Sequence, residues 1–589
     1  MKRTKIICTL GPSTDNIDTL VQLINEGMDV ARLNFSHGNK EERDARIALI
    51  KKAREITGKR IPILLDTKGI KIRTGYVQGY SDAEKRAAIE LRKGESVVFA
   101  CDSRQCKEVG IRSTSERIFI DYDDLPGQIK VGQHILLDDG LIATEVTSIE
   151  GKAITAKVLN TGRIVSRRSV NLPGLRLALD ALTESDKQDL LYGIAKDIDF
   201  VALSFVKRLE DVAKARRFLD DNGGGNVMII SKIENQEGVE NIDEILSLSD
   251  GLMVARGDMA VEVPFERVPA IQKEMIAKAL RARKVVITAT QMLHSMMKEP
   301  TPTRAEVSDV FNAIEDLTAC IMLSGETASG DYPVEAVRTM SAIALEAERV
   351  QEYERRFFAQ PMDAAGHVTT SVCHAAVSTA YQVRAKAIVA YTESGLTAKR
   401  LSALRPATPL LVVSSDERVV RQCHMLWGVQ PHRLDRMEQS EELYSAAMRI
   451  AEGLESGDNI VVVAGTAVGL SGSTNALRVM TKGDVIVRGT SVTNGTARGQ
   501  IRICKDFEDA QQLKAGEVAV LYRLYPEFEP YLDKVGAILL AGTEYDMRMM
   551  VRARALGVPI VMDVQGASDR LQDGMAVEVV GKKGVVLRA

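Results

Sequence analysis

Eight short apolar runs alternate with amphipathic segments along most of the first 354 residues, and this alternation is the strongest constraint on the fold. The runs have the length and composition of buried β-strands, and the segments between them have apolar residues at helical spacing. The eight predicted strands are Lys5–Thr9, Val30–Leu33, Ile61–Leu65, Phe200–Leu203, Val227–Ile230, Gly251–Ala255, Val285–Ala289 and Cys320–Leu323. Eight such units predict an α/β chain with a (β/α)8 TIM barrel, for which a doubly wound open sheet is the structural alternative.

The helices expected between these strands follow from the same periodicity. They are Thr14–Glu26, Lys40–Thr57, Glu184–Ala195, Leu209–Asp220, an amphipathic segment that ends at Ile242–Ile245, Glu266–Arg281, Arg304–Glu315 and Pro333–Glu354. We therefore assign residues 1–74 and 172–354 to the barrel.

Residues 75–171 interrupt the alternation with short strands and turns. The strands expected here are Glu95–Ala100, Arg117–Ile120, Gly132–Leu137, Ile142–Ile149 and Lys152–Val158, and Asp138-Asp139-Gly140 is expected to be a turn. The pattern predicts a small β domain inserted after the third barrel strand. A hinged lid over the barrel mouth is the functional interpretation, and an inert insertion is the alternative.

Two further regions follow the barrel. Residues 355–362 are predicted to be a linker, and residues 355–482 as a whole to form a C-terminal α/β domain. Its expected helices are Thr369–Arg384, Thr397–Leu404, Glu417–Met425 and Glu441–Glu455, and its expected strands are Ala387–Ala390, Leu410–Val413 and Asn459–Ala464. Residues 483–589 are rich in Gly and Val and predict an appended compact α/β domain, with strands at Gly536–Ala541 and Val558–Met562 around a helix at Arg548–Leu556.

Composition excludes several classes of function. The formal net charge is only −3, with 27% charged residues, so no large basic field for nucleic acid is expected. No apolar run reaches the length of a membrane helix, and the charged N-terminus lacks the apolar region of a signal peptide. The seven scattered cysteines fit a reducing, cytoplasmic location. Cys101 and Cys106 form the one close pair and have no further ligands nearby for zinc.

Polar side chains follow the predicted strands, most clearly in the stretch from Val227 to Asp258. Lys232 and Glu234 come after one strand, and Asp258 comes after the next. Because the carboxyl ends of barrel strands surround one mouth, these groups are expected to face a single pocket. A cation with two carboxylates could hold a divalent metal and stabilise a developing anion on a phosphate-bearing substrate. A solvated ion pair is the alternative for Lys232 and Glu234.

A hydroxyl-rich loop from Thr392 to Thr397 runs into a predicted helix N-terminus, where an anion could bind. Ordinary N-capping explains the same residues.

Nine segments together resemble the pyruvate kinase family. They are Lys5–Ser13, Ala31–Gly38, Leu65–Gly69, Asn171–Gly174, Ser231–Gly238, Met253–Asp258, Ile287–Leu293, Pro302–Asp309 and Met322–Ala336. The resemblance covers about residues 1–482. It implies a (β/α)8 barrel, an inserted β lid and a C-terminal domain that carries effector sites in many members. It also implies transfer of the phosphoryl group of phosphoenolpyruvate to ADP, the last step of glycolysis, in an allosteric cytoplasmic homotetramer.

The resemblance also implies roles for individual residues. Glu234 and Asp258 would hold Mg2+ or Mn2+, and Lys232 would neutralise the transferring phosphoryl group and the enolate. Backbone N–H groups of Gly257 and Asp258 would bind the substrate carboxylate, and Thr290 would lie on the route of the proton that forms pyruvate. Further residues implied by matching motifs are Arg32 and Arg73 as phosphate clamps, and Asn34, His37, Arg73 and Arg168 on the nucleotide side.

A monovalent cation site is implied at Asn34, Ser36, Asp66 and Thr67. Members that depend on K+ usually have Glu at the position of Lys71, and members with Lys there are similar to those that work without K+. A tethered ammonium can replace a bound cation, so we expect weak or absent K+ activation. The alternative is that Lys71 points to solvent and K+ still binds.

The tail resembles the phosphohistidine domain that some bacterial pyruvate kinases share with phosphoenolpyruvate-using dikinases and synthases. Counting back from Leu556-Gly557-Val558-Pro559 places Arg548 where that histidine would be, so we expect a structural or regulatory tail. The effector loop implied by the family comprises Thr392, Ser394, Gly395 and Thr397, and its ligand could be a sugar phosphate or a nucleotide monophosphate.

Two other functions are weighed against the kinase. A (β/α)8 lyase or aldolase acting on pyruvate with a bound metal explains Glu234 and Asp258, but not Arg32, His37 and the lid. A phosphoenolpyruvate-binding sensor without turnover is the alternative outside enzymes, and the intact Lys232 and Thr290 argue against it.

Overall fold

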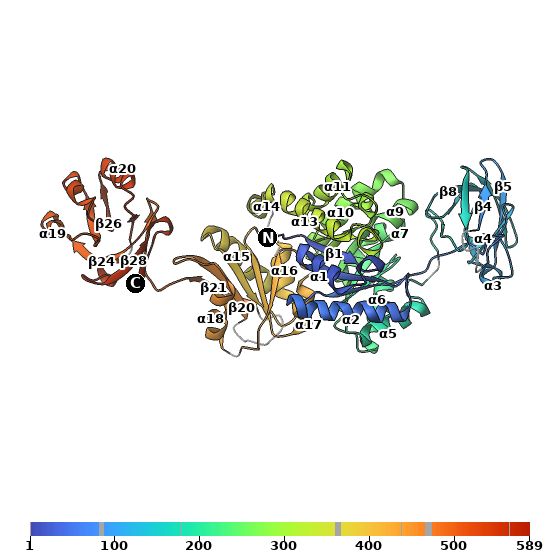
Figure 1. Ribbon diagram of the computed structural model, residues 1–589, viewed down its shortest axis with the longest axis horizontal. Helices are drawn as coiled ribbons and strands as arrows, with labels where there is room; N and C mark the ends of the chain where they lie inside the picture. Colours follow the sequence, from blue (N-terminus) through green and yellow to red (C-terminus); the bar gives the residue numbers. More distant parts are fainter. Residues whose placement is uncertain are drawn as a thin grey trace. The chain divides into compact units, whose positions relative to one another are not determined.

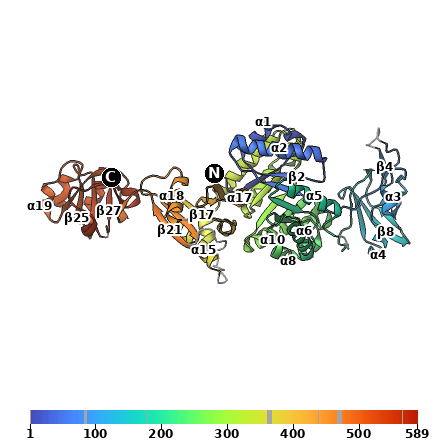
Figure 2. The ribbon, with the colours of Figure 1, turned by 90° about the horizontal axis from the view of Figure 1, so that it is seen from below.

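The computed structural model describes residues 2–81, 87–177, 180–359, 367–437, 439–465, 474–564 and 566–589. It contains two compact units. The first comprises Met1–Phe357, Ala398–Arg405 and Ser415–Arg433, and the second comprises Phe358–Thr397, Pro406–Ser414 and Leu434–Ala589. Figures 1 and 2 show both units coloured along the chain. The division into four domains remains a prediction.

The first unit contains a closed barrel of eight parallel strands, as expected. Its order is β1-β16-β15-β14-β13-β12-β3-β2, so sequence neighbours are also neighbours in space. The strands are β1 (Lys5–Thr9), β2 (Met28–Asn34), β3 (Ile63–Asp66), β12 (Phe200–Leu203), β13 (Met228–Ile233), β14 (Gly251–Ala255), β15 (Val285–Ala289) and β16 (Cys320–Leu323). All residues of β1, β3, β12, β14, β15 and β16 are buried, which explains their continuous apolar character.

Helices surround these strands (Figure 1). The barrel helices are α1 (Ile17–Glu26), α2 (Lys40–Thr57), α5 (Glu184–Ala195), α6 (Leu209–Asp221), α7 (Gln236–Glu240), α8 (Ile242–Leu248), α9 (Arg256–Glu262), α10 (Val268–Arg281), α11 (Arg304–Glu315), α12 (Gly325–Ala328) and α13 (Pro333–Arg349). Short 3-10 turns are η1 (Pro12–Thr14), η2 (Phe265–Arg267) and η3 (His294–Met297). The inner faces of these helices bury Ile and Leu against the strands in one continuous core.

The predicted linker is wrong in its first part. The structure has a helix there, α14 (Tyr353–Ala359). The preceding helix α13 ends at Arg349, earlier than the end predicted at residue 354. Tyr353 and Phe357 lie one helical turn apart and are both 5% exposed, and Tyr353 packs against Trp427 with ring centroids 5.2 Å apart. Burial of Tyr353 and Phe357 on one face explains the helix. Residues 360–362 of the predicted linker lie outside the described residues.

The insertion between β3 and β12 is mainly β structure, as predicted. Six strands pair in the order β11-β7-β8-β9-β5-β6, and β10 pairs with β4. The strands are β4 (Ala88–Leu91), β5 (Ser96–Cys101), β6 (Arg117–Ile120), β7 (His134–Leu137), β8 (Ile142–Glu150), β9 (Ala153–Val158), β10 (Gly162–Val165) and β11 (Val170–Asn171). Two short helices, α3 (Ser103–Lys107) and α4 (Leu125–Gln128), were not predicted. Asp138, Asp139 and Gly140 all have positive φ, which confirms the predicted turn.

The remaining part of the first unit includes α17 (Glu417–Cys423) and β19 (Val429–Arg433). In the second unit β18, β17, β20 and β21 are consecutive neighbours in a sheet. The elements of this region are α15 (Val368–Gln382), β17 (Ala387–Tyr391), β18 (Leu410–Ser414), α18 (Ser440–Ile450), β20 (Asn459–Gly465) and β21 (Thr474–Thr481). Helix α16 (Leu396–Ala403) begins in the second unit and has most of its residues in the first. Strand β21 is largely exposed and runs antiparallel to β20.

Residues 483–589 form an eight-stranded sheet in the order β22-β29-β28-β24-β25-β26-β27-β23. Its strands are β22 (Val485–Arg488), β23 (Thr490–Ser491), β24 (Thr496–Cys504), β25 (Val518–Leu524), β26 (Ala537–Tyr545), β27 (Ile560–Met562), β28 (Ala576–Val580) and β29 (Val585–Arg588). The helical segments are α19 (Phe507–Gln511), η4 (Pro526–Tyr531), α20 (Met547–Ala555), α21 (Ala567–Arg570) and η5 (Gly581–Lys583). The predicted helix and both predicted strands are present within one to four residues of their expected bounds.

Candidate active site

A buried carboxylate at the end of β3 joins side chains from neighbouring strands. Asp66 is 1% exposed, and it accepts hydrogen bonds from Arg32 Nε at 2.8 Å and from Lys232 Nζ at 3.0 Å. Arg32 also donates from Nη1 to Thr9 Oγ1 at 2.7 Å. Burial alone would raise the pKa of Asp66, but the charges of Lys232 and Arg32 outweigh it and lower that pKa. An ionised Asp66 therefore fixes two cations at the carboxyl ends of β2 and β13.

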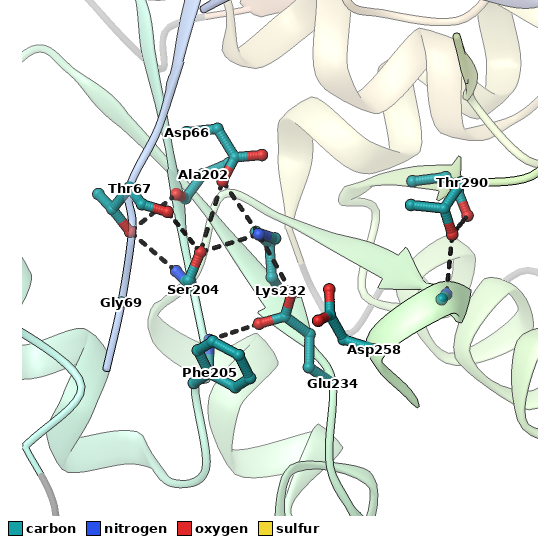
Figure 3. A network of polar contacts seen from close by, with 12 residues as sticks. Asp66, Thr67, Gly69, Ala202, Ser204, Phe205, Lys232, Glu234, Asp258 and Thr290 are labelled. Atoms are coloured by element: carbon teal, nitrogen blue, oxygen red, sulfur yellow. Dashed lines mark hydrogen bonds and ion pairs between the residues drawn. The ribbon is translucent and has the colours of Figure 1, made fainter. Parts of the chain in front are cut away.

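Lys232 is the centre of this cluster (Figure 3). Its ammonium also donates to Ser204 Oγ at 2.8 Å and lies 3.1 Å from Glu234 Oε1. Burial would lower the pKa of Lys232, but the charges of Asp66 and Glu234 reverse that effect and raise it. The lysine is therefore held as a cation in a site with little access to water.

Glu234 is fully buried and is fixed by a backbone donor. Its Oε2 accepts from the N–H of Phe205 at 2.7 Å, and Phe205 has a left-handed backbone with φ of 55°. Burial raises the pKa of Glu234; Lys232 opposes this effect and the charge of Asp258 adds to it. Any additional cation nearby would therefore favour the charged form of Glu234.

Asp258 lies in the first turn of α9, and a cation from another segment reaches it. Lys71 Nζ donates to Asp258 Oδ1 at 2.9 Å, and the same ammonium lies 5.6 Å from the centroid of the Phe205 ring. Burial would raise the pKa of Asp258, but Lys71 and Lys232 outweigh it and lower that pKa. Lys71 does not point to solvent: its side chain is 31% exposed and paired.

Thr290 follows β15 in a strained conformation and contacts α9. Its φ is 69°, which is rare for a β-branched residue. The hydroxyl accepts from the N–H of Gly257 at 2.8 Å and donates to the carbonyl of Ala289 at 2.7 Å (Figure 3). The two residues expected to bind the substrate carboxylate and to relay a proton are therefore in direct contact.

Two of the expected arginines lie away from the Lys232 cluster. Arg73 donates from Nη1 to the carbonyl of Arg167 at 2.9 Å, and burial together with the charge of Arg167 lowers its pKa. Arg168 pairs with Asp138 at 3.4 Å and its side chain is 48% exposed. Both residues lie where the chain joins the inserted β domain, so the structure does not bring them into contact with Lys232.

The expected monovalent cation ligands lie at the adjacent ends of β2 and β3, where Asn34 pairs in register with Asp66, and their side chains make other contacts. Both oxygens of Asp66 are engaged as described, and the hydroxyl of Thr67 accepts from the N–H of Ser204 at 3.0 Å. Asn34 Oδ1 accepts from the N–H of Ser36 at 3.0 Å within its own loop. His37 follows in the same loop and is exposed.

The hydroxyl-rich loop before α16 lies in the second unit. Thr392 Oγ1 accepts from the N–H of Gly395 at 3.0 Å, and Gly395 has φ of 78°. Thr397 Oγ1 lies 2.6 Å from Thr474 Oγ1. Ser394 completes the expected set. These contacts form a closed turn that leads into α16.

Comparison with known proteins decides the family. A family model described as pyruvate kinase, barrel domain, matches residues 1–337, and one described as pyruvate kinase, alpha/beta domain, matches residues 370–480. The chain belongs to the pyruvate kinase family. It is therefore a phosphotransferase. A third model, PEP-utilising enzyme, mobile domain, matches residues 513–584.

Relatives extend this match over the full length. A pyruvate kinase of Geobacillus stearothermophilus is 41% identical over 593 residues, covering 100% of this chain and 99% of the relative. A pyruvate kinase of Staphylococcus aureus is 39% identical with the same two coverages. A solved pyruvate kinase of Cryptosporidium parvum, 37% identical, superposes with a TM-score of 0.75 and covers 82% of this chain and 96% of its own.

The carboxylates of the site suit a divalent metal. Glu234 Oε1 is buried and has no hydrogen-bond partner, with only the Lys232 ammonium at ion-pair distance. Within the described residues no group of three or more His, Cys, Asp or Glu could hold a metal alone. Mg2+ is commonly bound through one or two carboxylates, with water and substrate phosphates completing its shell. The donor set of Glu234 and Asp258 fits that use and not a closed structural site.

Sequence reasoning missed three contributors to the site. Ser204 and Phe205 follow β12 directly, and they support Lys232 and Glu234. The signal available was a serine immediately after a wholly apolar strand. Arg256, next to Gly257, contacts the turn that contains Thr290.

In the described part of the chain no helix is both long enough and apolar enough to cross a membrane.

Proposed function

We propose that this chain transfers the phosphoryl group of phosphoenolpyruvate to ADP, giving pyruvate and ATP, and that the cluster around Lys232 performs the transfer. The observation that carries this proposal is the buried ammonium held by Asp66, Ser204 and Glu234 at the carboxyl ends of the barrel strands. Phosphoryl transfer needs positioning and charge stabilisation more than covalent chemistry, and a desolvated, preorganised cation supplies both.

Arg32 and Lys232 would receive the phosphoryl group. Asp66 orients both side chains, so their donors are fixed before the substrate binds. A planar guanidinium matches two phosphate oxygens, and the ammonium can stay close to both the phosphoryl group and the enolate oxygen. Arg73 would join them as a second clamp, which requires it to leave the carbonyl of Arg167.

Gly257, Asp258 and Thr290 would act on the other end of the substrate. The N–H groups of Gly257 and Asp258 would bind the carboxylate at the start of α9. In the structure the Gly257 N–H donates to Thr290 Oγ1, so the substrate carboxylate would replace that hydroxyl as the acceptor. The released hydroxyl of Thr290 would then lie on the route of the proton that enters the methyl group of pyruvate.

Glu234 and Asp258 would hold Mg2+ or Mn2+. When bound, such an ion supplies positive charge to the phosphoryl oxygens and the enolate. Glu234 is already buried, and the N–H of Phe205 orients its carboxylate. A monovalent cation site at Asn34, Ser36, Asp66 and Thr67 remains part of the proposal. We expect K+ to be dispensable because Lys71 already supplies a charge beside Asp258.

Other expectations complete the proposal. The nucleotide would lie near Asn34, His37, Arg73 and Arg168, beneath the inserted β domain acting as a lid. An effector would bind at Thr392, Ser394, Gly395 and Thr397. We also propose cytoplasmic location, a homotetramer, the four-domain division given above, and a regulatory or structural role for residues 483–589.

The deciding experiment couples pyruvate formation to lactate dehydrogenase, with phosphoenolpyruvate, ADP and Mg2+. We expect turnover, and loss of turnover in Lys232→Met but not in Lys214→Met, an exposed lysine on α6. Phosphoenolpyruvate-dependent thermal stabilisation without pyruvate would support a sensor. Pyruvate released without ATP would indicate hydrolysis of phosphoenolpyruvate to pyruvate and phosphate. Either result would overturn the kinase assignment.

A further inference from the structure

The turn after β15 holds two consecutive left-handed residues. Thr290 has φ of 69° and Gln291 has φ of 53°, and neither is glycine. Backbone of this kind persists only where the surroundings impose it, and it tends to occur at functional sites. The turn places the Thr290 hydroxyl against the N–H of Gly257. Something other than local preference must therefore hold the turn.

The side chain of Arg256 supplies that support. Its Nη2 donates to the carbonyl of Thr290 at 2.7 Å and to that of Gln291 at 3.4 Å, and its Nε donates to the carbonyl of Ala289 at 3.3 Å. Three successive carbonyls of the strained turn are thus bound by one guanidinium. The fork of five N–H donors in arginine makes this possible, whereas a lysine has one nitrogen.

Two flanking helices fix the guanidinium itself. Nη1 donates to Asp309 Oδ1 on α11 at 2.7 Å and to Gln272 Oε1 on α10 at 3.4 Å. The side chain of Arg256 is only 12% exposed, and Gln272 is 6% exposed. The arginine is therefore anchored from outside the pocket and does not need a ligand to keep its position.

Arg256 is also the residue before Gly257. Its side chain binds the backbone of Thr290, while the next N–H along the chain binds the Thr290 hydroxyl. The turn and the start of α9 are thus joined by two contacts to Thr290, one to its carbonyl and one to its hydroxyl. Displacing the turn would move the hydroxyl relative to the carboxylate-binding N–H groups.

We propose that Arg256, anchored by Asp309, is a positioning residue that holds Thr290 in the orientation needed for proton transfer to and from the methyl carbon of the substrate. This inference rests on the proposed function, since it assigns the proton route to Thr290. Arg256 touches neither the phosphoryl group nor the carboxylate in this scheme. Its loss should therefore affect proton transfer far more than phosphoryl transfer.

Two rates of the full-length enzyme separate these steps. ATP formation from phosphoenolpyruvate and ADP reports phosphoryl transfer. Exchange of the pyruvate methyl protons with D2O, followed by 1H NMR with Mg2+ and ATP present, reports removal and return of a proton at that carbon. We expect Arg256→Lys to slow exchange by about 100-fold, as for a misplacement near 1 Å, and ATP formation by less than about 5-fold.

A double-mutant cycle tests whether Arg256 acts through Thr290. In a Thr290→Ala background, Arg256→Lys should slow exchange by less than about twofold more, because the group that it positions is gone. Asp309→Asn keeps the arginine and weakens its anchor, so it should slow exchange by about tenfold. It also provides a second variant if Arg256→Lys does not fold. Arg349 on α13 forms an exposed ion pair with Glu346, so Arg349→Lys is the matched control and should change neither rate.

The outcomes are distinct. An equal fall of both rates in Arg256→Lys and Asp309→Asn, or an undiminished effect of Arg256→Lys without the Thr290 hydroxyl, would overturn the positioning role and leave the kinase standing. A wild-type enzyme that forms no ATP would overturn the proposed function, and this inference with it.

Discussion

The ammonium of Lys71 lies 2.9 Å from Asp258 Oδ1, so a side chain from the segment after β3 brings a positive charge to a carboxylate at the start of α9. Both oxygens of nearby Asp66 are likewise occupied, by Arg32 and Lys232. The barrel mouth therefore carries three built-in cations around its carboxylates. The prediction on K+ rests on this balance of charge.

The first prediction concerns K+. In a tetraalkylammonium buffer, pyruvate formation should change by less than about twofold when K+ is added, because a tethered ammonium at this distance replaces a mobile cation. Lys71→Gln should lower the rate without K+ by at least about tenfold, and K+ should restore part of it. Steady-state rates with and without K+ measure both effects.

Lys68→Gln is the matched control for that variant. Lys68 lies three residues earlier and pairs with Asp189 at 3.2 Å, so its loss should leave the K+ response unchanged. Strong K+ activation of the wild-type enzyme would contradict the role given to Lys71.

The second prediction concerns Ser204, which accepts from Lys232 at 2.8 Å and donates to the carbonyl of Thr67 at 2.7 Å. Ser204→Ala removes one of the three oxygens around the ammonium and leaves those of Asp66 and Glu234. A hydrogen bond to a charged group is worth about 1.5–3 kcal/mol, so kcat/KM for phosphoenolpyruvate should fall roughly 10- to 100-fold. Ser247 is an exposed serine, so Ser247→Ala should have no effect. An unchanged kcat/KM in Ser204→Ala would mean that Asp66 and Glu234 suffice to orient the ammonium.

Much of the barrel was predictable because its signals are local and redundant. Helices α5 and α11 have their predicted bounds, and in each a threonine N-cap forms a capping box with an acid three residues on: Thr183 with Asp186, and Thr303 with Glu306. Strand β21 was missed because only Thr474 in it is buried and polar residues interrupt its apolar ones. Helix α14 was missed because only tertiary burial distinguishes Tyr353 and Phe357 from a linker.

The site was predictable as far as strand ends converge. Lys232 lies near the end of β13, Glu234 follows that strand and Asp258 follows the neighbouring β14, so the barrel brings them together. The sequence could not show that Lys71 would reach Asp258, or that Phe205 would orient Glu234 through its backbone. Such contacts depend on loop paths and on left-handed φ values, which leave no periodic pattern.

The third prediction concerns stability and pH at the start of α11. Partial burial would raise the pKa of Glu306, but donors from Ser295 and Thr303 outweigh it and hold the pKa below its ordinary value. A carboxylate with a lowered folded-state pKa adds stability above its unfolded pKa of about 4.3, and that contribution is lost as pH falls through the folded value.

Glu306→Gln should therefore unfold at a lower temperature than the wild type at pH 7, and the difference should shrink on acidification below pH of about 4. Thermal unfolding of the full chain at both pH values measures this. Glu41→Gln removes an exposed first-turn acid of α2 and should show little change at either pH. A constant difference between Glu306→Gln and wild type would mean that packing, and not charge, is responsible.

The last prediction concerns residues 483–589, most of which match a phosphoenolpyruvate-utilising mobile domain. None of the seven histidines of the chain lies in this segment. Arg548 occupies the position where the motif count places a phosphohistidine, at the start of α20. It is fixed there by Asp546, with Nη2 to Oδ2 at 2.9 Å and its own N–H to Oδ1 at 2.8 Å.

Arg548 is not a histidine, and its guanidinium stays protonated, so no phosphohistidine can form at this position. Incubation with 32P-labelled phosphoenolpyruvate, followed by proteolysis at neutral pH, should leave no acid-labile label on peptides from residues 483–589. A protein that carries a known phosphohistidine, added before digestion, controls for loss of label. Acid-labile label on the tail would show a catalytic phosphocarrier and would contradict the structural or regulatory role assigned to it.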